Sequence, residues 1–241
     1  MVNPTVIESA KKAAAYKAVD ENIAVDNSIV GIGSGTTVLY VIQRLVELVK
    51  EKDWKITCIP TSFQARQRIL SNGLTLGTLD NYPKVDCTID GINEIDESFN
   101  IIKGGGGCLM EEKIVASCSK RYIVVADYTK DSRRLGTQCK DGLTIEVSPL
   151  AYVPVKNRIE EKFGGKAIVR MAGPANYGPF RSDHGHFFID WHFPEGIEDW
   201  EKINTEIILM PGVLETGLLI KAAHKAYFGM PDGSVFERTP S

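Results

Sequence analysis

Strand-like apolar runs alternate with amphipathic helical patterns through the first half of this chain, and this alternation constrains the fold more than any other feature. The run at 122–126 is almost continuously apolar, which is typical of a strand covered on both faces. The pattern predicts an α/β fold with a Rossmann-like wound, mainly parallel sheet. Predicted strands lie at 28–32, 55–59, 85–90 and 122–126, and predicted helices at 6–20, 37–49, 62–71 and 109–119.

The pattern changes after about residue 140, where a turn at 182–185 leads into a strand-like run at 186–191. We expect a second, smaller α+β domain at 141–218, in the contacts of a homodimer or homotetramer. The larger Rossmann-like domain then takes 1–140 and 219–241, with the chain returning to the first sheet near Leu218. Other predicted elements are strands at 143–147 and 167–171, a helix that ends near 163–165 and a helix at 198–208.

Composition argues against several classes of protein. With 241 residues, 43% of them hydrophobic, the chain can bury one large core or two smaller ones. A net charge of −3 without a basic run argues against nucleic acid as a partner. No apolar run approaches the ~18 residues of a membrane-spanning helix, and the N-terminus lacks a signal-like core. The five scattered cysteines form no CxxC pair, which predicts a reducing, cytoplasmic location.

A run of four glycines, 104–107, stands between Lys103 and Glu112; we call it the glycine loop. Glycines let a ligand approach the backbone and permit positive φ angles that aim N–H groups at an anion. The apolar residues that follow predict a helix, so Glu112 lies in its first turns. A partly desolvated carboxylate there can act as a base, and the ammonium of Lys103 can stabilise an oxyanion. A flexible tether is the alternative, but the tightly patterned helix that follows argues against it.

A second glycine-rich segment, Gly31-Ile-Gly-Ser-Gly-Thr-Thr37, follows a predicted strand and opens a predicted helix; we call it the glycine turn. Its N–H groups, hydroxyls and helix dipole suit a phosphate group. Thr36 replaces the third glycine of a dinucleotide-binding turn, and the Gly-Lys-Ser/Thr ending of a nucleotide P-loop is missing. A small phosphorylated ligand therefore fits better than a nucleotide. Tight packing without a ligand is an equally good explanation of the spacing alone.

Asp90 and Gly91 stand at the carboxyl end of a predicted strand, where open α/β sheets bind their ligands. A solvated acidic loop is a reasonable interpretation of the residues that follow, Glu94, Asp96 and Glu97. That interpretation is weaker for Asp90, which lies between an apolar residue and a glycine.

Lys130 follows the strand at 122–126 and could reach a phosphate at the same sheet edge, although taken alone it is more simply an exposed loop lysine. Hairpin polarity explains His184, His186 and His192 better than metal ligation does. The sequence therefore predicts no metal site.

Taken together, these segments resemble type A ribose-5-phosphate isomerases. The resemblance spans nearly the whole chain, and it includes the glycine turn, Asp90-Gly91 and the segment from Lys103 to Val115. It also includes Pro60-Thr-Ser-Phe-Gln64, Met210-Pro-Gly-Val213 and Phe228-Gly-Met-Pro-Asp-Gly233. The glycine loop followed by Cys108, and Ile189-Asp-Trp191, resemble eukaryotic members more closely.

This resemblance implies an aldose-ketose isomerase that interconverts D-ribose 5-phosphate and D-ribulose 5-phosphate through an enediolate, in the non-oxidative branch of the pentose phosphate pathway, without metal or organic cofactor. It implies that Glu112 is the base that carries a proton between adjacent carbons. Asp90 matches a residue that helps to open the sugar ring and moves hydroxyl protons, and Lys103 stabilises the developing oxyanion. Implied substrate contacts, besides Asp90 and Lys103, are Ser34, Gly35, Thr36, Thr37, Gly91, Asn93, Gly104, Gly105, Gly106, Lys130 and Lys11.

One position departs from the family pattern. The family usually has Asp-Gly-Ala-Asp-Glu after this strand, whereas this chain has Asp90-Gly-Ile-Asn-Glu94. An amide keeps the hydrogen-bonding shape of a carboxylate but accepts no proton and carries no charge at neutral pH. Because Asp90, Lys103 and Glu112 are all present, we expect activity to survive with Asn93.

Two other functions fit parts of the pattern. A non-catalytic sugar-phosphate sensor needs the glycine turn but neither Lys103 nor Glu112, and it usually accompanies a DNA-binding domain, for which the sequence has no room. An amino-sugar-phosphate deaminase or a lactonase is expected to have an active-site histidine, whereas all four histidines fall in the last quarter of the sequence. Both alternatives rank below the isomerase.

Overall fold

The computed structural model describes residues 4–173 and 177–240. The chain divides into two compact units: the first comprises Met1–Ile92, Glu111–Asp131 and Ala222–Ser241, and the second comprises Asn93–Met110 and Ser132–Lys221. The predicted class, a mainly parallel α/β sheet with a second, smaller α+β part, is confirmed. The second unit is larger than the predicted 141–218, because it also takes in residues 93–110 and 132–140.

The first unit is built on a seven-stranded sheet with the order β14-β13-β7-β4-β1-β2-β3. All neighbouring pairs are parallel except β13 and β14. The strands are β1 Ile29–Ile32, β2 Thr57–Pro60, β3 Thr75–Leu76, β4 Cys87–Gly91, β7 Tyr122–Asp127, β13 Lys225–Gly229 and β14 Val235–Arg238. The helices are α1 Pro4–Asn22, α2 Val38–Lys52, α3 Phe63–Ser71 and α4 Leu109–Ser117, with a 3₁₀ turn at Tyr128–Lys130.

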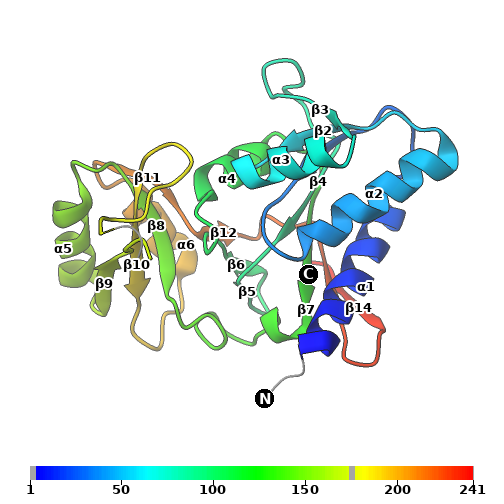
Figure 1. Cartoon of the computed structure of the whole chain (residues 1–241). Helices are drawn as coiled ribbons and strands as arrows, with labels where there is room; N and C mark the ends of the chain where they lie inside the picture. The colour runs from blue at the N-terminus through cyan, green and yellow to red at the C-terminus, as the bar shows by residue number, and fades with distance from the viewer. Residues whose placement is uncertain (1–3, 174–176, 241) are drawn as a thin grey trace. The chain divides into compact units, whose positions relative to one another are not determined.

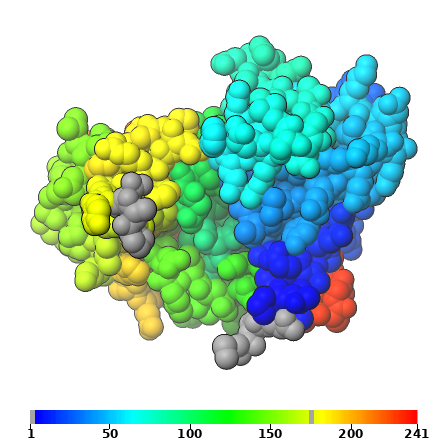
Figure 2. Space-filling view, in the orientation of Figure 1, coloured from blue at the N-terminus to red at the C-terminus, as the bar shows by residue number. Residues whose placement is uncertain are grey.

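Helices cover both faces of this sheet. The buried residues of α2, at Val38, Val41, Ile42, Leu45 and Leu48, recur with helical spacing and join the core that also includes α1 residues. Within β2, Cys58 belongs to this core while Ile59 packs with Val115 of α4, and successive strand residues point to opposite faces. So α4 lies on the face opposite α1 and α2. Figure 1 shows α1 beside α2, and Figure 2 shows α2 in light blue beside α3 in cyan.

Two antiparallel sheets form the second unit, with strand orders β11-β8-β10-β9 and β12-β6-β5. Trp191 is fully buried among their apolar residues, and its indole N–H donates to Gly164 O at 2.9 Å. The elements are β5 Glu94–Ile95, β6 Asn100–Ile102, β8 Leu143–Val147, α5 Tyr152–Phe163, β9 Lys166–Val169, β10 Phe187–His192, α6 Trp200–Ile208, β11 Val213–Thr216 and β12 Leu218–Ile220.

The sequence predicted that the chain returns to the large sheet near Leu218. The structure shows that this prediction is wrong. Residues 218–220 form β12, which pairs with β6 in the small three-stranded sheet, and the return comes at β13. An apolar run of three residues predicts a strand but carries no information about its partner. In the part of the chain that the structure describes, no helix has the length and apolar content to span a bilayer.

Candidate active site

The glycine turn connects β1 with α2 at the carboxyl edge of the large sheet. Gly33 donates its N–H to Ile89 O of the neighbouring β4 at 3.0 Å. Gly35 has φ +100°, a left-handed conformation that favours glycine. Its carbonyl accepts a hydrogen bond from Arg68 of α3 at 2.8 Å. Residues on β4 and α3 therefore fix the path of the turn.

The Ser34 hydroxyl belongs to a cluster of three hydroxyl groups. It lies 3.0 Å from Thr61 Oγ1 and donates to Ser62 Oγ at 2.7 Å. Ser62 also caps α3 by accepting the N–H of Ala65 at 3.0 Å. Thr61 lies near Ser34 because their neighbouring strands end at the same edge, a contact that no motif in the sequence indicates.

Lys11 of α1 lies against the glycine turn. Its ammonium donates to Thr36 Oγ1 at 3.0 Å and to Glu8 Oε1 at 2.8 Å. The hydrogen bond from Lys11 lowers the pKa of the Glu8 carboxyl, with a further contribution from the Tyr40 hydroxyl. The turn therefore has a cation beside it.

Asp90 is fully buried at the end of β4 and organises the backbone around it. Its Oδ1 accepts the N–H groups of Gly91 at 2.7 Å and of Ser34 at 3.1 Å. Its Oδ2 lies 3.5 Å from the hydroxyl of Tyr122. The carboxylate thus joins the glycine turn to β4.

Because Gly33 has no side chain, the Asp90 carboxylate can lie directly against its Cα. A Cβ on Gly33 would lie 2.0 Å from Asp90 Oδ1 and 2.6 Å from Asp90 Cα, so the backbone would have to move. We expect Gly33→Ala to lower the free energy of unfolding by about 1–3 kcal/mol and to lower turnover as well. Gly178→Ala is the control, because a Cβ there meets open space. Denaturant unfolding measures the difference, and a Gly33 variant as stable as the control would contradict the packing argument.

Glu112 lies in the first turn of α4 and is 4% exposed. Val115 follows three residues later, on the same face of the helix. A Cβ on Gly31 would lie 2.9 Å from Val115 Cγ1, so this face of α4 packs on β1. Glu112 therefore faces the sheet beside the strand that leads into the glycine turn.

The direction of α4 brings Glu112 to the same edge as Asp90. Just after α4, Cys118 accepts the N–H of Val85 at 2.9 Å, and Val85 precedes the amino end of β4. The carboxyl end of α4 therefore lies near the amino end of β4. Its amino end, which carries Glu112, points to the opposite edge, where β4 ends at Asp90 and Gly91.

Lys130 ends the 3₁₀ turn that follows β7. The buried Asp127 caps this turn by accepting the N–H of Thr129 at 3.0 Å. Because β7 is parallel to β4, with Val125 opposite Gly91, Lys130 also lies at the carboxyl edge of the sheet.

In the second unit, the glycine loop follows the buried Lys103, which is 3% exposed. Lys103 donates its backbone N–H to Gly217 O at 2.8 Å. Gly104 has φ +102°, and a Cβ on it would lie 2.9 Å from Thr144 Cβ. The first position of the loop therefore requires glycine for both its conformation and its packing.

Asn93 supports the loop from the side. Its Oδ1 accepts the N–H of Gly105 at 3.3 Å, a role that the oxygen of an aspartate could also fill. A cavity of about 330 Å³ in this unit is lined by residues that include Asn93, Lys103, Gly105 and Arg170. A larger cavity of about 550 Å³ adjoins it and shares Cys139, Gly142 and His192 in its lining, and no described residue that lines it is a predicted site residue.

Comparison with known proteins identifies the family. The sequence pattern of ribose 5-phosphate isomerase A (phosphoriboisomerase A) matches residues 57–233. The chain belongs to the ribose-5-phosphate isomerase A family. A curated ribose-5-phosphate isomerase from Sus scrofa is 50% identical over 228 residues, which cover 95% of this chain and 74% of that protein. One from Candida albicans is 46% identical over 237 residues, 98% of each chain.

Solved structures agree with this assignment. A ribose-5-phosphate isomerase in complex with phospho-erythronic acid matches with a TM-score of 0.90 and 32% identity, over 97% of this chain and 99% of that one. The fold expected for a type A ribose-5-phosphate isomerase is therefore confirmed.

The site residues predicted for this member of the isomerase A family lie in both units. The first unit holds Lys11, Ser34, Gly35, Thr36, Thr37, Asp90, Gly91, Glu112 and Lys130, and the second holds Asn93, Lys103, Gly104, Gly105 and Gly106. Parallel strands bring the glycine turn, Asp90 and Lys130 to one edge, and the direction of α4 adds Glu112.

The interpretation of the segment after Asp90 as a solvated acidic loop is wrong for two of its residues. Glu94 is fully buried and accepts the N–H groups of Gly136 and Gln138, both at 2.7 Å. Asp96 is 6% exposed and accepts two backbone N–H groups at 2.8 and 2.9 Å. Glu97 is exposed, as expected. These two buried carboxylates hold the loops around them by accepting backbone N–H groups. Sequence alone does not reveal which N–H groups a carboxylate will accept.

One histidine has a structural contact that the sequence did not show. The fully buried Glu146 accepts the N–H of Met110 at 3.1 Å, in the first turn of α4, and lies 2.9 Å from His186 Nδ1. Glu146 therefore satisfies an N–H group that the helix itself leaves without a partner. Among the described residues, no group of three or more His, Cys, Asp or Glu side chains is arranged to hold a metal ion.

Proposed function

We propose that this chain interconverts D-ribose 5-phosphate and D-ribulose 5-phosphate through an enediolate. The supporting observation is that Asp90 and Glu112, both buried carboxylates, lie with the glycine turn at the carboxyl edge of one sheet. Ligands of open α/β sheets bind at that edge. Family membership points to the pentose phosphate among the ligands that the glycine turn could accept.

In the proposed reaction, the Glu112 carboxylate removes the proton from C2 of the open-chain aldose and returns it to C1. Negative charge develops on O1, and the ammonium of Lys103 and the N–H groups of the glycine loop stabilise it. Asp90 moves the hydroxyl proton from O2 to O1 and assists ring opening. Each transferred proton returns to the sugar, so the product is an isomer of the substrate.

We place the phosphate of the substrate at the glycine turn. The N–H groups and hydroxyls of residues 34–37 and the amino end of α2 favour an anion. The ammonium of Lys11, 3.0 Å from Thr36 Oγ1, supports this placement, as does Lys130 at the same edge.

The proposal is tested by a turnover assay on the purified protein, with ribose 5-phosphate as substrate and EDTA present. Formation of ribulose 5-phosphate supports an isomerase without a chelatable metal. Binding of the phosphosugar without turnover would instead support the sugar-phosphate sensor.

Asn93 should be compatible with this chemistry, because its amide oxygen already supports the Gly105 N–H. We expect Asn93→Asp to change kcat by less than about 100-fold, and Asn81→Asp, an exposed change in the first unit, to have no effect. A gain in kcat above ~100-fold, about 2.7 kcal/mol, would show that the carboxylate found at this position in the family takes part in proton transfer, which the amide cannot do.

We also propose a homodimer or homotetramer that forms through the second unit, in the cytoplasm. Exposed apolar side chains of that unit support this assembly: Leu150 is 94% exposed and Leu209 is 74% exposed. The five free cysteines suit a reducing compartment. We expect sedimentation velocity to show an oligomer that Leu209→Glu weakens. A wild-type monomer at all concentrations would contradict the assembly.

A further inference from the structure

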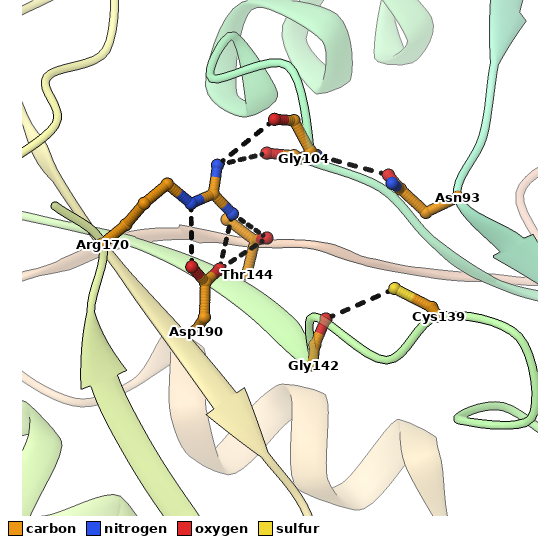
Figure 3. A network of polar contacts seen from close by, with 8 residues as sticks. Asn93, Gly104, Cys139, Gly142, Thr144, Arg170 and Asp190 are labelled. Atoms are coloured by element: carbon orange, nitrogen blue, oxygen red, sulfur yellow. Dashed lines mark hydrogen bonds and ion pairs between the residues drawn. The ribbon is translucent and has the colours of Figure 1, made fainter. Parts of the chain in front are cut away.

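Arg170, directly after β9, lies at the centre of a polar network in the second unit (Figure 3). Its Nε donates to Asp190 Oδ2 at 2.8 Å, and its Nη2 donates to Asp190 Oδ1 and to Thr144 Oγ1. Its Nη1 donates to the carbonyls of Gly104 at 3.0 Å and Gly105 at 3.4 Å. These bonds use all five N–H donors of a guanidinium, so Arg170 supports the loop rather than a ligand.

The contacts with the two carbonyls fix the direction of two N–H groups. In a trans peptide, the carbonyl of one residue and the N–H of the next point to opposite sides of the chain. Because the Gly104 carbonyl points at Arg170, the Gly105 N–H points away from it, and it meets Asn93 Oδ1 at 3.3 Å. The Gly105 carbonyl likewise turns the Gly106 N–H away from Arg170.

Arg170 is itself held on the rigid part of the unit. Its backbone N–H donates to Phe188 O at 2.9 Å, and its guanidinium lies 5.1 Å from the centre of the Phe188 ring. Asp190 on β10 stands opposite Thr144 on β8, and Thr144 Oγ1 donates to Asp190 Oδ1 at 3.2 Å. Two paired strands thus anchor the side chain that holds a loop of consecutive glycines.

We propose that Arg170, held by Asp190, is a positioning residue that keeps the glycine loop in the conformation that aims the Gly106 N–H at the enediolate oxygen, while Asn93 holds the Gly105 N–H. This inference rests on the proposed function, which assigns the Gly106 N–H to that oxygen. A run of glycines has many accessible backbone conformations, and a preorganised donor needs no reorientation as charge develops. Asp190 balances the charge of Arg170, so the support adds little net charge near Lys103.

The test compares Arg170→Met with Arg181→Met in the intact protein. Arg181 lies in the same unit and packs over Phe187, and its Nη1 donates to the Gly185 carbonyl at 3.3 Å, outside the glycine loop. We expect Arg170→Met to lower kcat about 10- to 100-fold with little change in KM. Affinity for phospho-erythronic acid, whose carboxylate resembles the enediolate, should fall by a similar factor, while affinity for inorganic phosphate stays constant. Arg170→Lys should recover part of the loss, and Arg181→Met should match the wild type.

A second measurement follows the amide NMR signals of Gly105 and Gly106, which need no turnover. We expect both signals to shift in Arg170→Met and to stay in place in Arg181→Met. Unchanged signals or wild-type kcat in Arg170→Met would overturn the inference, and so would an equal loss of affinity for both ligands with a lower Tm. A wild-type protein without turnover would refute the proposed function and the catalytic purpose of the network, while the NMR comparison would still decide whether Arg170 orders the loop.

Discussion

Replacing Glu112 by Gln should lower kcat about 10³-fold, equivalent to about 4 kcal/mol, while KM stays within a few-fold of the wild-type value. The amide keeps the shape of the side chain but cannot remove the C2 proton. A loss confined to kcat is expected when the missing group acts in the transition state and not in substrate binding. Steady-state kinetics with ribose 5-phosphate measures both constants.

Glu111→Gln is the matched control, since Glu111 stands one position earlier in the same turn of α4 and carries the same functional group. We expect this variant to retain most of the wild-type kcat. If Glu112→Gln keeps full turnover, or if both variants lose it equally, the base must be assigned to another residue.

Replacing Lys103 by Met should lower kcat about 10²- to 10³-fold, because the enediolate oxygen would lose its proposed cationic partner. Lys103 is 3% exposed, so its charge is screened far less than that of a surface lysine. KM should change less than kcat, because the proposed phosphate contacts lie elsewhere. The measurement again compares kcat and KM, together with Tm to monitor folding.

Lys166→Met serves as the control for Lys103, since Lys166 is an exposed lysine on β9 of the same unit. It should leave kcat unchanged. A Lys103 variant with normal kcat would remove Lys103 from the proposed mechanism, and a large fall in Tm would assign the residue to the stability of its unit.

The large sheet could be predicted because each of its longer strands and helices has a clear local pattern. The α2 helix shows apolar residues at helical spacing, and β7 is apolar from Tyr122 to Ala126. The small sheet β12-β6-β5 could not be predicted, because it consists of strands of two or three residues whose partners are distant in sequence. For the same reason the predicted second domain, 141–218, leaves out residues 93–110 and 132–140, which belong to the second unit.

Within the candidate site, the sequence indicated the residues that carry a distinctive chemical pattern and missed those that support them. Asp90 ends one predicted strand and the glycine turn follows another, so the rule for parallel sheets already suggested their shared edge. Arg170 stands in a segment without a motif, and its role depends on a contact with a loop 66 residues earlier. Glu94 and Glu146 were missed because a buried carboxylate is recognised by its N–H partners, which only the folded chain supplies.

The most direct test of Glu112 as the base is the isomerisation of ribose 5-phosphate in D₂O with EDTA present, followed by NMR at C1 and C2 in the wild type and in Glu112→Gln. We expect the wild type to form ribulose 5-phosphate and to incorporate deuterium at the carbons that exchange the proton. We expect Glu112→Gln to show neither turnover nor incorporation on the same time scale. Incorporation by Glu112→Gln at the wild-type rate would contradict the assignment of the base.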